Sequence, residues 1–147
     1  MELESKRDLL RHLVATIIFR GRLAVSGAPD EFENFGIGQG TRTAGQILAH
    51  IGDLMEGTLH MMQGEMVYLD TQHASWEADV VRFLSAAGNL ELFFASDAPL
   101  AQPLENLVQG PIADALTHIG QIVMLRRAAG SPIEETAYFT ADIYTGR

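Results

Sequence analysis

Cysteine is absent from this sequence of 147 residues. Without a thiol, the chain has neither a disulfide framework nor a thiolate metal site nor a cysteine nucleophile. Long apolar runs are missing too, since none reaches the roughly 20 residues that a bilayer-spanning helix needs. The sequence begins with charged residues and lacks the apolar stretch of a secretory signal there, so we expect a soluble cytoplasmic protein.

Basic residues are scarce, because 10 lysines and arginines stand against 19 acidic residues and give a net charge of −9. Nucleic-acid binding depends on clustered cations that neutralise phosphates. Only Lys6-Arg7 and Arg126-Arg127 place two basic residues side by side, and neither pair forms a stripe with aromatic residues. We therefore expect no nucleic-acid partner and no membrane partner.

The composition, with 47% hydrophobic and 20% charged residues, is that of a globular chain. The length suits one domain, which we place at residues 1–147. Apolar residues recur at three- and four-residue spacings over residues 3–25, as an amphipathic helix requires. A second such pattern begins after Thr41 or Thr43, either of which could cap the helix, and continues to about Glu65.

The third helical pattern begins at Ser75 and ends near Ser96. Trp76, Phe83 and Leu90 recur in it every seven residues, which predicts a core seam. A turn-rich link follows, with one short helical turn expected over residues 103–107.

The fourth helix is predicted to start at Pro111, because proline suits the first helical position. Arg126 and Arg127 suit the negative end of its dipole, and Gly130 is expected just after its last turn. The sequence thus predicts an all-α four-helix bundle with a long first crossover and a C-terminal tail packed on the bundle.

Three alternating glycines, at positions 36, 38 and 40, lie in the first crossover. A dinucleotide-binding loop needs a preceding strand, a helix directly after it and a different glycine spacing, and a P-loop needs Gly-Lys-Ser/Thr. None of these is present, so we interpret the segment as a surface crossing between two helices.

The strongest chemical pattern is a carboxylate and an imidazole four residues apart, at Asp114 and His118. Residues at this spacing share one face of a helix. His50, at the margin of the apolar stripe of the second helix, would face them if the second and fourth helices are neighbours. Two histidines and one carboxylate leave coordination positions open, as in catalytic zinc and non-haem iron centres.

Each candidate ligand also has a structural interpretation. A lone histidine at the edge of a core is commonly a hydrogen-bonded packing residue. Asp114 would be the fourth residue of its helix, where the macrodipole favours an acid without any metal. His12, His60 and His73 are interpreted as solvated or packing residues. Spacing alone leaves ligation and packing both open.

Two segments resemble the DinB/YfiT-like superfamily. The first resembles its last bundle helix and reads Ala115-Leu116-Thr117-His118-Ile119-Gly120-Gln121-Ile122, followed by Leu125-Arg126-Arg127. The second resembles its second helix and reads Ile47-Leu48-Ala49-His50-Ile51-Gly52-Asp53-Leu54. Helix order and motif spacing agree with the family over most of the chain. The resemblance implies a four-helix bundle, often dimeric, in which three histidines bind a divalent metal.

By this resemblance His50 and His118 match ligand positions, whereas Asp114 stands where the family usually has histidine. A carboxylate is the harder ligand and shifts the preference towards iron or manganese without excluding zinc or nickel. It also lowers the positive charge of the site, which makes a bound water less acidic. Asp53 and Gln121 are candidates to orient the histidines.

The resemblance implies a metal-dependent enzyme that acts on a small molecule, either a thiol-dependent S-transferase or a hydrolase, in a homodimer. The alternative is a non-catalytic bundle that binds a small ligand or a protein partner without metal. DNA binding, which the family's name suggests, is opposed by the acidic charge.

Overall fold

The computed structural model describes residues 2–146, so Met1 and Arg147, the ends of the expected domain, lie outside it. The described chain is helical and contains no β-strand, as predicted. Its elements are α1 (Leu3–Val25), the 3-10 turn η1 (Phe32–Asn34), α2 (Ala44–Met62), α3 (Trp76–Ala95), α4 (Leu104–Leu107), the π-helical turn η2 (Val108–Ile112), α5 (Ala113–Ala128) and the 3-10 turn η3 (Tyr138–Thr140).

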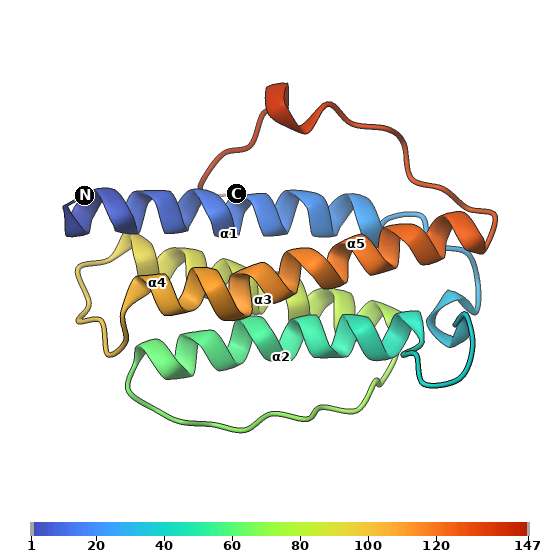
Figure 1. The fold of residues 1–147 in the computed structure, drawn as a ribbon, viewed down its shortest axis with the longest axis horizontal. Coiled ribbons are helices and arrows are strands. Elements are labelled where there is room, and N and C mark those ends of the chain that lie inside the picture. Colours follow the sequence, from blue (N-terminus) through green and yellow to red (C-terminus); the bar gives the residue numbers. More distant parts are fainter. Residues whose placement is uncertain (1, 147) are drawn as a thin grey trace.

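Four long helical segments form a bundle, because α4, η2 and α5 follow one another with helical backbone angles at both junctions. Both α1 and α2 pack against α3 and α5, which makes α1 and α2 diagonal partners. Figure 1 shows α1 and α5 running in one direction and α2 and α3 in the other. The first crossover, residues 26–43, therefore links diagonal helices, and residues 63–75 return along the length of α2 (Figure 1).

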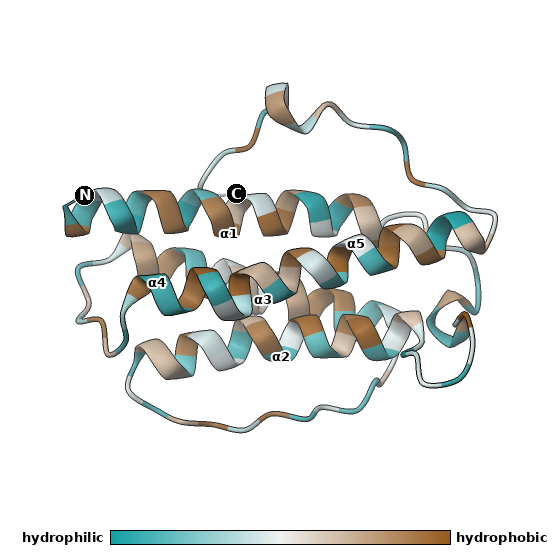
Figure 2. Ribbon diagram, viewed as in Figure 1, coloured by the Kyte–Doolittle hydropathy of each residue, from teal (hydrophilic) through white to brown (hydrophobic). Residues whose placement is uncertain are grey.

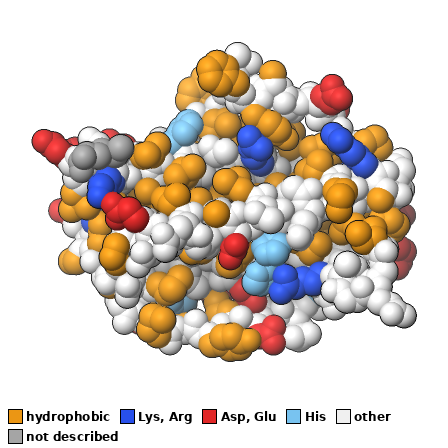
Figure 3. Space-filling model, viewed as in Figure 1, with side chains coloured by type: hydrophobic (Ala, Val, Ile, Leu, Met, Phe, Trp, Pro, Cys, Tyr) orange, Lys and Arg blue, Asp and Glu red, His pale blue; other side chains and the backbone are white. Residues whose placement is uncertain are grey.

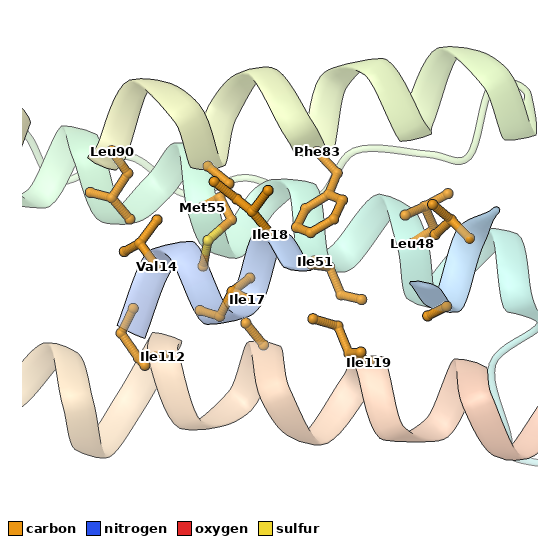
Figure 4. Packing of buried hydrophobic residues seen from close by; sticks show 14 of the residues in the cluster. Val14, Ile17, Ile18, Leu48, Ile51, Met55, Phe83, Leu90, Ile112 and Ile119 are labelled. Carbon is orange, nitrogen blue, oxygen red and sulfur yellow. The ribbon is translucent and has the colours of Figure 1, made fainter. Parts of the chain in front are cut away.

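The core is one apolar cluster to which all four helical segments contribute (Figure 4). Hydrophobic residues recur along each of the long helices (Figure 2). Trp76, Phe83 and Leu90 are all buried, so the predicted seam is confirmed. Gly21 of α1 lies against the ring of Phe83, where a Cβ would stand 2.5 Å from a ring carbon. Only glycine allows α1 and α3 to approach this closely. Within residues 2–146, no helix is both long and apolar enough to cross a membrane.

The start of α2 is set by Thr43, one of the two predicted caps. Its hydroxyl accepts a hydrogen bond from the N–H of Gln46, and the Gln46 side chain accepts one from the N–H of Thr43. The helix ends at Met62, three residues before the predicted Glu65. Gly64, with φ of 87°, turns the chain in the left-handed conformation that closes helices.

Replacing Thr43 by alanine is expected to lower the free energy of unfolding by about 1 kcal/mol, because the Gln46 N–H loses its partner. Thr43→Ser keeps the hydroxyl and should remain close to the wild type. Urea denaturation followed by circular dichroism measures both variants. An alanine variant as stable as the serine variant would contradict this account of the cap.

The prediction that Pro111 starts the fourth helix is wrong. The helical segment begins at Leu104, in the short turn predicted separately, and passes through η2 with Pro111 inside it. Proline removes a backbone donor and crowds the preceding turn, and a π-helical turn is a common way for a helix to accommodate such a disturbance. Asp114 thus lies within a longer helical segment rather than near its beginning.

The end of α5 follows the prediction, because Gly130 has φ of 78°. The Ser131 N–H donates to the Arg126 carbonyl at 2.9 Å and closes the last turn. The tail beyond it arches away from the helices in Figure 1. It contacts the bundle where the Tyr138 ring lies 3.8 Å from the Arg20 guanidinium, whereas Phe139 is fully exposed. The aromatic residues of the tail are therefore not part of the core.

Candidate functional site

The side chains of His50 and His118 lie against each other. They come from α2 and α5, which pack together in the bundle. Their ring centroids are 4.8 Å apart and their ring planes make an angle of 83°. Both side chains are partly exposed. On the face drawn in Figure 3, histidine side chains reach the surface beside acidic and basic ones.

Gln121 fixes the orientation of the His118 ring. Its Oε1 lies 2.8 Å from Nδ1 of His118, one helical turn earlier. An amide oxygen only accepts, so Nδ1 is the donor here, and in the neutral ring Nε2 is then the nitrogen with the lone pair. A hydrogen bond of this kind sets the tautomer and ring direction of a metal-binding histidine. Gln121 therefore lies where an orienting residue would be needed.

Asp114 lies one turn before His118 on α5 and is exposed. Its negative charge acts to raise the pKa of His50, although other causes outweigh it. Within residues 2–146, however, no three His, Asp or Glu side chains are arranged to hold a metal ion. The structure thus brings two of the expected ligands together and leaves Asp114 beside them.

The pKa of His50 lies below its ordinary value of 6.5. Burial is the largest cause, and the charges of Arg42 and His118 act in the same direction. Asp53 and Asp114 oppose the shift but do not overcome it. Neutral imidazole is the form that binds a metal, so this environment favours the ligand form of His50 at neutral pH.

Arg42→Gln is expected to raise the pKa of His50. Of the two positive charges that lower this pKa, the substitution removes the one with the larger effect. The unfolded chain takes up a proton on this residue at higher pH than the folded chain does. Above pH 6.5 His50 is neutral in both states, and its full contribution to the free energy of unfolding is present. As the pH falls towards the folded-state pKa, the unfolded chain binds the proton more readily, and this contribution is lost.

An NMR titration of the His50 ring measures this shift, with Arg22→Gln as a control that removes a cation from an exposed position on α1. The control should leave the His50 pKa unchanged. A wild-type His50 pKa at or above 6.5 would contradict the assignment. So would equal pKa values in the wild type and the Arg42→Gln variant.

The hydrogen-bond partners of Asp53 are Thr71 and Arg82 rather than the histidines. One carboxylate oxygen accepts from the Arg82 guanidinium, and the other accepts from the Thr71 N–H at 2.9 Å. Arg82 also donates to Glu56 at 2.9 Å. Burial acts to raise the pKa of Asp53, but the hydrogen bonds from Thr71 and Arg82 outweigh it and leave that pKa below its ordinary value. Asp53 thus joins α2 to α3 and to the link over residues 63–75.

His73 of the same link forms a histidine–carboxylate pair with Asp79, which the sequence did not predict. Nδ1 of His73 lies 2.5 Å from the carboxylate of Asp79, and the His73 ring packs over Gly45. A Cβ at Gly45 would stand 2.8 Å from that ring. Asp79 lies in the first turn of α3, so this pair joins α3 to the link over residues 63–75. His73 therefore has a packing role, as interpreted.

Two cavities are lined by His50 or by Gln121, the hydrogen-bond partner of His118. The larger, of about 410 Å³, lies between the first crossover, α2 and α5, and its walls include Gln121. The smaller, of about 250 Å³, is lined by polar residues that include His50 and His73. Arg42 lines both cavities, although no sequence pattern pointed to this residue.

The glycine-bearing crossover runs over the surface between α1 and α2, as interpreted. Gly38 and Gly40 have φ of 137° and 76°, conformations that side chains rarely adopt. Gly40 and Ile37 contribute to the wall of the larger cavity. These glycines shape the turn that covers the ends of α2 and α5.

The fold and the site together define a helical bundle with a pair of facing histidines between two of its helices. Comparisons with protein-family models, with curated proteins and with solved structures found no match.

Proposed function

We propose that this chain is a divalent-metal-dependent enzyme of the DinB-like type, with His50, Asp114 and His118 as metal ligands. The observation that supports this most is the contact between the two imidazoles, with centroids 4.8 Å apart. Bundles build metal sites in this way, from side chains on facing helices.

The residues present fit a metal in three respects. The hydrogen bond to Gln121 leaves Nε2 of His118 free to coordinate. The lowered pKa of His50 favours its neutral, ligating form. Asp114 is exposed and one turn from His118, so its carboxylate is free to turn towards the pair. Three such ligands would leave positions for water or substrate, as in a catalytic centre.

A bound divalent ion would lower the pKa of a water or thiol, or polarise a substrate group. The chain's own residues would hold and orient that ion: His50 and His118 from two helices, and Gln121 through its hydrogen bond to His118. The reaction we propose is transfer or hydrolysis on a small molecule, including thiol-dependent S-transfer, in a cytoplasmic homodimer. Asp114 favours iron or manganese, with zinc and nickel as further candidates.

The competing proposal is a metal-free bundle that binds a small ligand or a protein partner. It is favoured by the absence, within residues 2–146, of an arranged group of three metal-binding side chains. In that case the contact between His50 and His118 would be ordinary aromatic packing.

Titration with Mn²⁺, followed by NMR of the histidine rings, tests the metal centre. A site at the pair should broaden the ring signals of His50 and His118 at substoichiometric Mn²⁺, whereas His12 and His60 should remain sharp. Equal broadening of all four rings, or none at stoichiometric Mn²⁺, would favour the metal-free bundle.

A further inference from the structure

The larger cavity, whose wall includes Gln121, has an apolar body. Four of the residues that line it have aliphatic or thioether side chains: Ile37, Ile47, Met124 and Leu125. Ile37 and Met124 are 56% and 53% exposed, so this apolar surface is open to solvent. A volume of about 410 Å³ suits a small molecule and is within the range of ligand pockets.

Arg42 supplies the only charge among the described residues that line this cavity. Its guanidinium makes no hydrogen bond or ion pair to another residue in the part of the chain described. Arg7, Arg11 and Arg82, by contrast, all bind oxygen atoms. Arg22 and Arg127, which are exposed on helices, resemble Arg42 in making no such bond within residues 2–146, but neither lines this cavity. Arg42 also lies just before α2, whose N-terminal dipole adds to the positive potential.

We infer that this cavity binds an amphipathic monocarboxylate, with its carboxylate on Arg42 and its apolar chain against Ile37 and Met124. The planar guanidinium matches a carboxylate through two parallel hydrogen bonds. A cationic ligand would be repelled by Arg42, and a purely apolar ligand would leave the guanidinium without a partner. Thr41 and Gln121 also line the cavity and offer further polar contacts.

This inference rests on the proposed function for its place in a reaction. Gln121 both lines the cavity and binds His118, and Arg42 acts electrostatically on His50. Arg42 also lines the smaller cavity together with His50, so a carboxylate held on Arg42 would lie close to the histidine pair. The cavity would select anionic substrates with an apolar part.

Calorimetric titration with octanoate and with octanamide, its neutral analogue, tests the inference in the presence of a chelator. The wild type should bind octanoate more tightly than octanamide. Arg42→Gln should weaken octanoate binding about tenfold and change octanamide binding less than twofold. Arg22→Gln, which removes the same charge from an exposed site on α1, should change neither. Ile37→Gln should weaken both ligands by similar factors.

Equal affinity of the wild type for the two ligands, or equal octanoate binding by Arg42→Gln and Arg22→Gln, would overturn the inference. Because the titration excludes metal, its result is independent of the metal centre. Octanoate binding through Arg42 in a protein that never binds metal would refute the metal centre alone. Metal bound at His118, with no preference for octanoate, would refute this inference alone.

Discussion

Replacing Arg126 by methionine is expected to lower the free energy of unfolding by about 3–4 kcal/mol. Arg126 is only 4% exposed, and its guanidinium donates to the carbonyls of Ala24 at 2.9 Å and Ser26 at 2.8 Å. It also donates to Gly27 and to Ser131. Methionine fills a similar volume but leaves these acceptors without a donor.

The cost is large because these carbonyls belong to two helix ends at once. Ala24 and Ser26 lie at the C-terminus of α1, and Ser131 closes α5. Burial lowers the pKa of Arg126, yet an arginine remains charged throughout the ordinary pH range. One fixed cation therefore satisfies the negative ends of two neighbouring helices.

Arg127→Met is the matched control, since Arg127 is the adjacent residue and is exposed. It loses only a dipole interaction at the helix end, expected to be below about 1 kcal/mol. Urea denaturation of both variants measures the difference. Similar losses in the two variants would contradict the role assigned to Arg126.

His118→Ala and His50→Ala are each expected to lower affinity for a divalent metal about 100-fold or more, because each removes a proposed ligand. Asp114→Ala should weaken binding less, by about tenfold, since the structure leaves this carboxylate outside the pair. Competition with a chromophoric chelator measures all three affinities.

His12→Ala controls for histidine loss at a site unrelated to the pair, because His12 is exposed on α1. It should bind metal as the wild type does. Thermal melting of the metal-free variants separates lost ligation from lost folding. Equal affinities in His12→Ala and His118→Ala would contradict the assignment of His118.

The helices could be predicted from the sequence because their signals are local. Apolar residues at helical spacing placed the core seam at Trp76, Phe83 and Leu90, and Thr43 and Gly130 marked helix ends. The start of the last helix was mispredicted for a physical reason. Proline favours the first position of a helix, but a π-helical turn can also accommodate it inside one, as at Pro111.

The candidate site was predictable only in part. The proximity of His50 and His118 followed from placing α2 beside α5, which a bundle makes plausible. Hydrogen bonds between residues far apart in the sequence could not be predicted, because no local sequence pattern indicates them. Arg126 suggested only a dipole interaction, yet its acceptors Ala24 and Ser26 lie about 100 residues away. Asp53 was expected to orient the histidines, but its carboxylate instead accepts a hydrogen bond from Arg82 on α3.

The interpretation of Asp114 also depends on non-local structure. A helix starting at Pro111 would explain the acid by the macrodipole alone. Because the helical segment already begins at Leu104, Asp114 is not in the first turn of that segment, and the macrodipole explains the acid less well. The position of this carboxylate one turn before His118 then favours its interpretation as a ligand.

Elemental analysis of untagged protein, purified without added metal, tests the metal centre most directly. The wild type should retain close to one divalent ion per chain, and His118→Ala should lose it while keeping its helical circular dichroism spectrum. No metal in either protein, with melting temperatures unchanged by zinc, nickel, manganese or iron, would contradict the proposed function.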